Sequence, residues 1–547
     1  QKTAYEILSG LVGSEMCIRD RFWKRCIVFS GVCWLTGGIA SLIGGYWITN
    51  SIHVFGHIPF IFSLLITGAG YGLEVGLQLF VYFAIPLLCI KKLGNWELSL
   101  RLAYVIAIDP WYPRLIHWNY GGLTFSQFPF LEQVADIIGS SGLLFYSLGL
   151  SYLLIAWWRL KSDLKNLNNN EMGYRFLKRA IAAYSLLWAV GLSYGAWRIQ
   201  DINENGNQQN SDSFINVIAI QPNFSLQDLA SNPELAHSKR QGNLERLFED
   251  SKKYLSKLPK QSIEPTLLVW PESVFPLPFF KVKEARQKVT RFAEENNTAI
   301  LFTTVDWENT INDRKFHGVS VLVGSNGEIL GRYNKIFLIP FGEMIPFSNI
   351  FPETASWLRN NIANMSEFDP GLDYKVFSLS EKVRISAPIC FDVFSQEVVR
   401  GMSLNGANLV VNLSNLAWFG RSTASENMVA VLRWRAIENR VPVIFASNNG
   451  ESVFIGADGK NLSRQLGLFE EGALIARLQL QSRFSFYRKH EEWIRGGFVF
   501  IFIVFGLCSR AFSQIFLSYL KLKNSFMLQV VQFMDRILKC HFLFTIM

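Results

Sequence analysis

Apolar segments that flank a polar middle constrain this fold more than any other feature of the sequence. Half of the residues are hydrophobic and only 18% are charged, which is too apolar for an ordinary soluble protein. A bilayer crossing takes about 20 mostly apolar residues. The candidate spans are residues 26–47, 54–90, 102–118, 141–158, 180–197 and 496–520.

Two of these segments need comment. Residues 54–90 are long enough for two crossings, although Glu74 interrupts them, and residues 102–118 are a weaker candidate because they carry Asp109, Arg114 and two prolines. We therefore expect six or seven spans.

The composition divides the chain into five parts. Residues 1–21 include "SGLVGSEMCIRDR", which resembles a translated library-adapter string, so we treat them as a candidate non-native leader. Transmembrane helices are expected over 22–198, a soluble domain over 199–492, a last span over 493–520 and a cytoplasmic tail over 521–547.

Lysine and arginine beside the apolar segments predict the orientation. The loop 159–179 and the tail are rich in these residues, which places both in the cytoplasm by the positive-inside rule. The soluble domain then lies on the periplasmic or extracellular side. The same rule accounts for the net charge of +9, and no basic stripe interleaved with aromatics indicates a nucleic-acid partner.

The soluble part alternates β-branched runs with helical patterns. Apolar residues recur at spacings of three and four in "GNLERLFEDSKKYLSKL", "KVKEARQKVTRFAEEN" and "SENMVAVLRWRAIENR". Apolar strands between such helices are typical of an α/β layered domain with strands buried on both faces. Candidate strands begin at Ile215, Thr266, Ala299, Val319, Val383, Asn408 and Pro442.

Three of these strands end in a group that can do chemistry. Glu272 follows "LLVW", Lys335 follows "GRYN", and Cys390 ends "VRISAPI"; Glu343 comes eight residues after the lysine. A thiol, a carboxylate and an ammonium suffice for acyl transfer, as nucleophile, proton carrier and oxyanion stabiliser. Taken singly, each has a simpler interpretation: a core cysteine, a solvated glutamate and a surface lysine.

The cysteine and histidine pattern predicts no metal site. Cys390 is the only cysteine between Cys89 and Cys508, and the chain has no C-x-x-C pair. Three residues separate His53 from His57, but no cysteine or acid joins the pair, so we interpret both as interfacial histidines.

The surroundings of these residues resemble the carbon–nitrogen hydrolase (nitrilase) superfamily, and within it the membrane-embedded apolipoprotein N-acyltransferase family. The similar blocks are "LVWPESVFP", "YNKIFLIPFGEMIPF", "APICFD", "NLSNLAWFG", "RWRAIENRVPVIFASNNG" and, on the membrane side, "FSQFPFLEQVADIIGSSGLLF". The resemblance covers about residues 22–520. It implies a nitrilase-like αββα sandwich for the soluble domain beside the multi-span helical domain.

The resemblance also implies a function and a role for each residue. Cys390 takes an acyl chain from a phospholipid as a thioester, Glu272 is the general base and acid, and Lys335 stabilises the oxyanion. The chain then passes to the α-amine of a lipoprotein's diacylglyceryl-cysteine, without metal or cofactor, at the periplasmic side of a bacterial inner membrane. Supporting or substrate-binding residues are Glu343, Phe391, Asp392, Asn415 and Trp418.

Several positions depart from the family pattern. Phe391 and Asp392 replace the usual Tyr and Glu, Leu416 replaces an Asp, and Ile336 and Phe337 replace an Arg and a His. Two alternatives therefore stay open: a membrane-tethered amidase or acyltransferase acting on another substrate, and a non-catalytic lipoprotein-binding paralogue.

Aromatic residues near the expected site are candidates for contact with the membrane. They are Phe279, Phe280, Phe351, Trp357, Trp418 and Phe419.

Overall fold

The structure is a computed structural model of the chain. It describes residues 4–89, 97–115, 125–126, 128–163, 171–205, 213–225, 233–259, 263–309, 314–361, 367–480 and 483–508. The predicted tail 521–547 and part of the span 496–520 lie outside the described residues.

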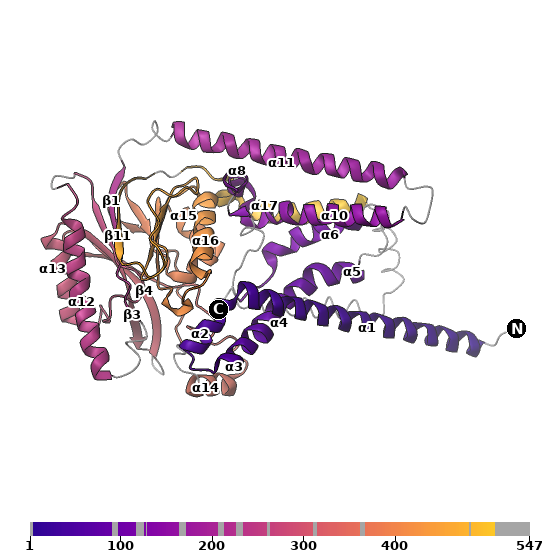
Figure 1. Ribbon diagram of the computed structural model, residues 1–547, viewed down its shortest axis with the longest axis horizontal. Coiled ribbons are helices and arrows are strands. Elements are labelled where there is room, and N and C mark those ends of the chain that lie inside the picture. The colour runs from indigo at the N-terminus through magenta and orange to yellow at the C-terminus, as the bar shows by residue number, and fades with distance from the viewer. Residues whose placement is uncertain are drawn as a thin grey trace.

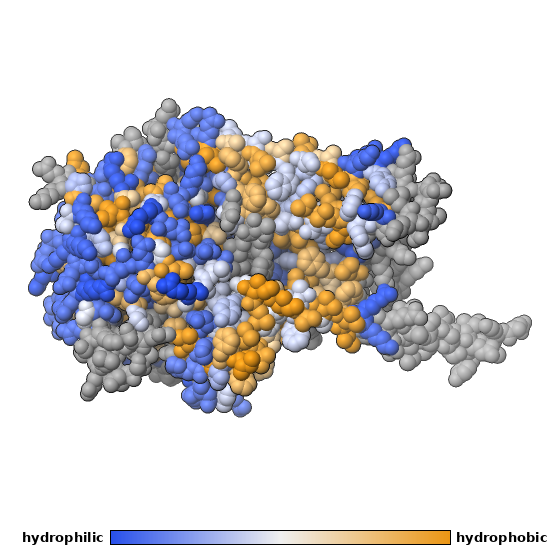
Figure 2. Space-filling model, in the orientation of Figure 1, coloured by the Kyte–Doolittle hydropathy of each residue, from blue (hydrophilic) through white to orange (hydrophobic). Residues whose placement is uncertain are grey.

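Helices form one half of the molecule and two stacked sheets form the other (Figure 1). Hydrophobic side chains gather over the helical half, whereas hydrophilic ones dominate the surface around α12 and α13 (Figure 2). The helices of the membrane half are α1 (Ala4–Gly44), α2 (Tyr46–Val54), α3 (Phe60–Leu65), α4 (Gly72–Leu79), α5 (Ile85–Cys89), α6 (Glu97–Ile108), α8 (Pro129–Glu132), α9 (Ala135–Gly142), α10 (Leu144–Asp163), α11 (Glu171–Asn205) and α17 (Phe486–Cys508).

Within the described residues, three helical stretches are long and apolar enough to cross a membrane. They are Lys24–Gly44, Phe60–Leu87 and Tyr174–Glu204, and a fourth arises if Ala135–Gly142 and Leu144–Trp158, bent by 59°, form one span. The protein is thus a membrane protein with three or four candidate spans in this part of the chain.

The expectation of two crossings within residues 54–90 is wrong. Phe60–Leu87 is one candidate span, because π-helical turns at Ile66–Tyr71 and Phe80–Ala84 continue the helix without reversing it. In the described part of residues 102–118, α6 ends at Ile108 and a short 3₁₀ turn follows at Asp109–Trp111, so this part forms no candidate span.

Glycines allow α1 and α4 to approach closely. A Cβ on Gly37 would lie 2.5 Å from the carbonyl oxygen of Gly72, and one on Gly72 would lie 2.6 Å from the Cα of Gly38. Small residues at such a crossing are typical of helices that pack within a bilayer. The contact positions the end of α1, and α2, which follows α1 directly, contacts the soluble domain at Trp418.

The soluble domain is an αββα sandwich, which confirms the predicted fold class. One sheet has the strand order β11-β1-β2-β3-β4-β5, and the other has the order β10-β9-β8-β7-β6. The strands are β1 (Phe214–Gln221), β2 (Thr266–Val269), β3 (Ala299–Asn309), β4 (Arg314–Val323), β5 (Ile329–Asn334), β6 (Phe377–Ser378), β7 (Arg384–Ser386), β8 (Leu409–Ser414), β9 (Val443–Ser447), β10 (Val453–Ile455) and β11 (Gly472–Gln479).

Helices cover the outer face of each sheet. Figure 1 shows α12 (Pro233–Leu255) and α13 (Lys283–Glu295) outside the first sheet. It shows α15 (Gln396–Leu404) and α16 (Ala424–Asn439) between the second sheet and the membrane helices. The remaining helix of the soluble domain is α14 (Pro352–Asn361).

Burial on both faces explains the apolar strands. In β1, Ile215, Val217 and Ala219 join the core between the sheets, whereas Ile218 and Ile220 join the core under α12 and α13. Successive side chains of a strand point to opposite faces, so both sets must be apolar. The two sheets therefore pack face to face through a shared apolar core, which brings the ends of their strands close together.

Candidate functional site

The structure brings together the three reactive groups that the sequence places at strand ends. Glu272 follows β2, Lys335 directly follows β5, and Cys390 opens a 3₁₀ helix, Cys390–Phe394, after β7. The Lys335 Nζ lies 3.5 Å from Glu272 Oε1, and the Cys390 thiol is hydrogen-bonded to the Glu272 carboxylate. These groups come from both sheets, so the site exists only when the sandwich is assembled.

Glu343 lies in the same cluster. Its Oε1 accepts a hydrogen bond from Lys335 Nζ at 2.7 Å, and its Oε2 accepts one from the Ile339 backbone N–H at 2.9 Å. The carboxylate thus joins the lysine to the loop that follows it. The Lys335 ammonium therefore lies between two carboxylates, those of Glu343 and Glu272.

The turn at the cysteine is strained. Cys390 has φ +47°, a left-handed conformation that is uncommon for residues other than glycine. Asn412 Nδ2 donates to the carbonyl oxygens of Pro388 and Cys390 at 3.2 and 3.1 Å, which holds the turn in place. Such strain persists only where surrounding contacts fix the backbone, and it is common at functional sites.

Burial sets the charge state of the cluster. Burial opposes the charged form of Lys335, but the carboxylates of Glu343 and Glu272 outweigh this effect and raise the pKa of the ammonium. Burial also raises the pKa of Glu272, with a contribution from Glu343 and a partial offset from Lys335.

The thiol of Cys390 is not a preformed thiolate. Burial, together with the negative charge of Glu272, raises its pKa well above the ordinary value, despite the opposing effect of Lys335. A thiol in this state attacks a carbonyl only if a base removes its proton during the attack. Glu272, hydrogen-bonded to the thiol, is placed to be that base.

Asp392 ties the cysteine turn to the lysine loop. Its carboxylate accepts hydrogen bonds from the backbone N–H groups of Ile389, Ile336 and Phe337 at 2.9, 3.2 and 2.7 Å, and from the Tyr333 hydroxyl at 2.8 Å. Burial raises the pKa of Asp392 to about 6, although these hydrogen bonds and Lys335 favour its charged form. Although Asp is one methylene shorter than the Glu usual at this position, its carboxylate contacts both the cysteine turn, at Ile389, and the lysine loop, at Ile336 and Phe337.

Asn415, Phe391 and Trp418 connect the cluster to neighbouring segments. The Asn415 N–H donates to Glu272 Oε2 at 2.9 Å. The Trp418 carbonyl accepts from Ser51 Oγ at 2.8 Å, and the Phe391 ring lies 6.2 Å from that of Trp47. Ser51 and Trp47 belong to α2, a short helix between the candidate spans Lys24–Gly44 and Phe60–Leu87, so α2 packs against the segments that carry Phe391 and Trp418.

The expected membrane-facing aromatics divide into three groups by exposure. Phe351 and Trp357, just before and within α14, are 60% and 59% exposed. The expectation is wrong for Phe279, which is buried against Phe275 and Phe302 in the core of the soluble domain. It is wrong for Phe419 too, which is buried against Trp47. Phe280 and Trp418 are half-buried.

Sequence reasoning missed Tyr333, Asn412 and the contribution of α2. The backbone donors at Ile336 and Phe337 leave no signature in a sequence, because every residue except proline carries an N–H group. Among the described residues, no group of three or more His, Cys, Asp or Glu side chains is arranged to hold a metal ion.

Comparisons with known proteins give the following similarities. A family profile described as carbon–nitrogen hydrolase matches residues 232–486. The apolipoprotein N-acyltransferase of Geobacter metallireducens is 27% identical over 462 residues, covering 83% of this chain and 82% of that protein. The apolipoprotein N-acyltransferase of Haemophilus ducreyi is 24% identical over 525 residues, covering 93% and 92%.

Solved structures are also similar to part of the chain. A mutant of the amidase from Nesterenkonia sp. AN1, with acrylamide added at its active-site cysteine, is 19% identical, with a TM-score of 0.36 over 52% of this chain and 99% of that one. Saccharomyces cerevisiae Nit3, of branch 10 of the nitrilase superfamily, is 17% identical, with a TM-score of 0.36 over 51% and 94%.

Proposed function

Because this chain belongs to the apolipoprotein N-acyltransferase family of the carbon–nitrogen hydrolase superfamily, we propose that it transfers an acyl chain from a phospholipid to the α-amino group of a lipoprotein's N-terminal diacylglyceryl-cysteine. One observation carries the proposal. The carboxylate, the ammonium and the thiol converge in one cluster, and α2, which lies between two candidate membrane spans, packs against the neighbouring Trp418 segment.

In the first half-reaction, Cys390 Sγ attacks the carbonyl carbon of a phospholipid ester while Glu272 takes the thiol proton. The Lys335 ammonium stabilises the negative charge that develops on the carbonyl oxygen. When the ester C–O bond breaks, Glu272 returns the proton to the departing lysophospholipid oxygen. The product is a thioester on Cys390.

In the second half-reaction, the α-amine attacks the thioester carbon. Glu272 takes a proton from the amine and delivers it to the sulfur as the C–S bond breaks, which regenerates the thiol and forms the amide. Burial supports this sequence, because Cys390 is only 2% exposed and a thioester there is protected from water.

The placement of exposed aromatics supports a lipid substrate. Phe351 and Trp357, at α14, and Phe60, Ile61 and Phe62, at α3, are all exposed. Exposed apolar side chains of this kind offer contacts to an acyl chain. An acyl chain that leaves the bilayer can stay in contact with apolar side chains as it approaches the thiol.

The intact mass of the purified protein after incubation with phospholipid tests the first half-reaction. We expect a gain of one acyl chain that hydroxylamine removes, and no gain in Cys390→Ala. Cys33→Ala, which removes a thiol on α1, is the matched control and should still be acylated. A folded wild-type protein that gains no acyl chain from any of several phospholipids would contradict the proposal.

We further propose that the protein lies in a bacterial inner membrane with the soluble domain in the periplasm. The basic loop 159–179 supports this orientation. Ile263 is fully exposed on the soluble domain, so Ile263→Cys should react with a membrane-impermeant maleimide in cells whose outer membrane alone is permeabilised. Labelling only after the inner membrane is broken would reverse the orientation.

A further inference from the structure

Buried polar side chains at α8 and α9, in the membrane half, contact the soluble domain. The block "PFLEQVADIIGSSG", residues 129–142, forms α8 and α9. Its Gln133, Asp136 and Ser140 are spaced three and four apart and all are buried. Buried polar groups need partners, and the described contacts of these three residues include partners on the soluble domain. We call these three residues the docking face of α8 and α9.

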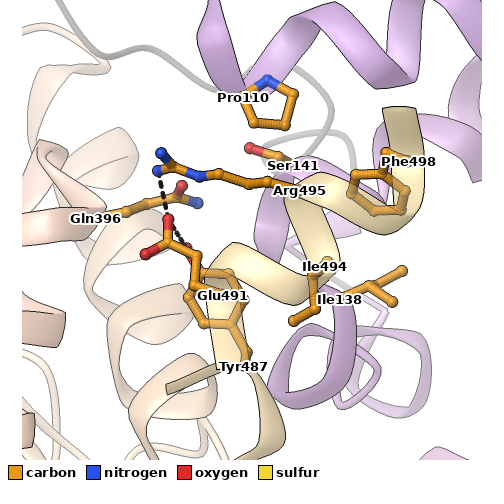
Figure 3. A pocket seen from close by; sticks show the side chains of 9 residues that line it. All are labelled: Pro110, Ile138, Ser141, Gln396, Tyr487, Glu491, Ile494, Arg495 and Phe498. Carbon is orange, nitrogen blue, oxygen red and sulfur yellow. Dashed lines mark hydrogen bonds and ion pairs between the residues drawn. The ribbon is translucent and has the colours of Figure 1, made fainter. Parts of the chain in front are cut away.

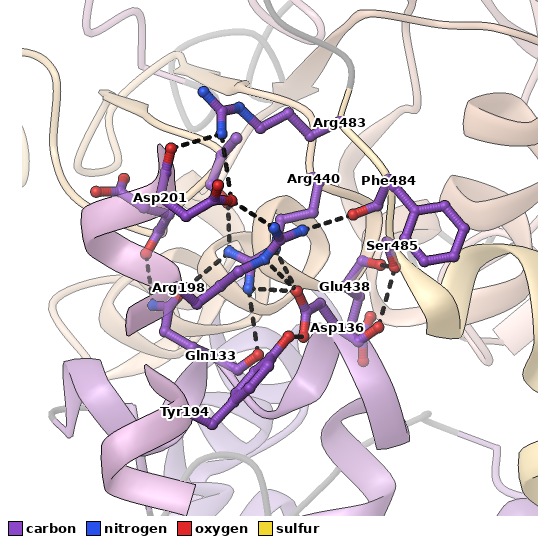
Figure 4. Close-up of polar contacts among 12 residues, drawn as sticks. Gln133, Asp136, Tyr194, Arg198, Asp201, Glu438, Arg440, Arg483, Phe484 and Ser485 are labelled. Atoms are coloured by element: carbon purple, nitrogen blue, oxygen red, sulfur yellow. Dashed lines mark hydrogen bonds and ion pairs between the residues drawn. The ribbon is translucent and has the colours of Figure 1, made fainter. Parts of the chain in front are cut away.

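Asp136 and Gln133 hold an arginine at the end of α16. The Arg440 guanidinium is fully buried and donates four hydrogen bonds: to Asp136 Oδ2 at 2.9 Å, Gln133 Oε1 at 2.7 Å, the Gln133 carbonyl at 3.2 Å and the Ala457 carbonyl at 3.0 Å (Figure 4). Its Nη2 also forms an ion pair with Asp136 Oδ2 at 2.7 Å. This set of contacts leaves the arginine one geometry.

The helix α11 completes the anchor. Arg198 Nε donates to Asp136 Oδ2 at 2.9 Å, and the Tyr194 hydroxyl donates to Asp136 Oδ1 at 2.7 Å (Figure 4). The Asp136 carboxylate therefore joins α9, α11 and the end of α16. Apolar packing of Trp434 and Ile437 on α16 against the membrane helices adds to this contact.

Ser140 makes a second contact, with the helix that follows the nucleophile. Gln396 Nε2 donates to Ser140 Oγ at 2.6 Å and to Glu438 Oε1 at 3.0 Å, and Glu438 Oε1 also accepts from the Ser140 N–H at 2.8 Å. Gly139, at φ +70°, makes this possible, because a Cβ there would lie 2.5 Å from the Tyr487 ring.

Gln396 is the first residue of α15 and lies six residues after Cys390. The Cys390–Phe394 3₁₀ helix runs into α15 through Ser395, whose hydroxyl accepts from the Val398 N–H. On one side, Gln396 borders a small cavity that Ile138, Ser141 and Tyr487 also line (Figure 3).

We infer that the docking face of α8 and α9 is a positioning element for the proposed reaction: through Ser140 and Gln396 it fixes the start of α15, and with it the Cys390 turn, relative to Glu272. The inference rests on the proposed function. Asp136 and Arg440 fix the position of α9 relative to α16. Gln396 then fixes the start of α15 relative to α9 through its hydrogen bond to Ser140. The alternative is an interface that only holds the two halves of the protein together.

Gln396→Leu tests the inference, because it keeps the bulk of the side chain and removes both hydrogen bonds. We expect the rate constant of thioester formation at saturating phospholipid to fall about tenfold to a hundredfold, on the order seen when reacting groups are displaced by about 1 Å. The half-saturating phospholipid concentration should not change. Leu404→Ala, at the exposed far end of α15, is the matched control and should keep the wild-type rate.

The pH profile separates positioning from a merely structural role. Burial raises the pKa of Glu272, and the hydrogen bond from the Cys390 thiol offsets part of this rise. A turn that moves away loses this bond, so the acidic limb of the profile should move to higher pH in Gln396→Leu. A change in thermal stability alone would leave the limb in place.

Two outcomes would overturn the inference: a wild-type rate and profile in folded Gln396→Leu, or the same result in Ser140→Ala should Gln396→Leu fail to fold. Ser140→Ala removes only the hydroxyl, so it should also lower the rate constant of thioester formation, by a smaller factor. Failure of the proposed function is distinguishable, since the wild-type protein itself would then form no thioester.

Discussion

Replacement of Lys335 by methionine should destabilise the protein as well as stop acylation. The ammonium lies between two carboxylates, 2.7 Å from Glu343 and 3.5 Å from Glu272, and its side chain is 1% exposed. Without it, two buried carboxylates face each other, and one must take up a proton. Protonating a carboxyl with an ordinary pKa of 4.5 at pH 7 costs about 3 kcal/mol, which sets the size of the loss.

The loss should depend on pH. Burial already raises the pKa of Glu272, and loss of the Lys335 charge removes an effect that lowers it, so the penalty grows as the pH rises above 4.5 and disappears below it. The double variant Lys335→Met/Glu343→Gln removes one of the two carboxylates. It should recover most of the stability and none of the activity, since removing both partners of a buried pair costs far less than removing one.

Thermal unfolding in detergent, followed by tryptophan fluorescence, measures these differences. At roughly 2–4 °C per kcal/mol, Lys335→Met should unfold about 10 °C below the wild type at pH 7. The difference should shrink at pH 5. An unchanged melting temperature in Lys335→Met, or a double variant less stable than the single one, would refute the electrostatic reasoning.

Three further predictions concern the same site. The rate of thioester formation should rise with pH through a pKa above the ordinary carboxyl value of 4.5, because Glu272 must be ionised and burial raises its pKa; a profile flat down to pH 4 would argue against Glu272 as the base. Asp392→Ala should lower the free energy of unfolding by about 4 kcal/mol and slow acylation, because two buried and two part-buried donors lose their acceptor at about 1 kcal/mol each, as a melting curve and a rate would show. Phe351→Ser/Trp357→Ser should raise the phospholipid concentration needed for half-maximal acylation without lowering the maximal rate, provided that these exposed side chains contact the lipid and not the thiol.

The sequence predicts the convergence of Glu272, Lys335 and Cys390 because each follows an apolar strand, and strand ends of a layered α/β fold meet at common edges. It could not predict what holds these residues in place. Asp392 looks like a shortened substitute in the sequence, yet its carboxylate reaches the backbone of Ile336 and Phe337.

Apolar residues were harder to assign than reactive ones. Phe279 and Phe351 both lie in aromatic stretches, but one is buried in the core and the other is 60% exposed. A protein core and a bilayer favour the same side chains, so a single sequence does not separate them. The span count fails for the same reason: residues 54–90 have the length of two crossings and form one candidate span, Phe60–Leu87.

The contacts between the two halves of the protein had no sequence signal. Arg440 and Asp136 are 304 positions apart, and each alone reads as a surface charge. Only the structure shows that they share a buried site with Gln133. Long-range polar partners of this kind depend on the final packing of elements that are specified independently.

The central claim is that Cys390 carries an acyl chain to an amine, and a chase of the isolated acyl-enzyme tests it most directly. The thioester form is mixed with a synthetic diacylglyceryl-cysteine peptide, and both products are weighed by mass spectrometry. We predict that the protein loses one acyl chain as the peptide gains it on its α-amine, and that a peptide with an acetylated α-amine gains nothing. Release of the chain as free fatty acid at the same rate with and without peptide would contradict the account.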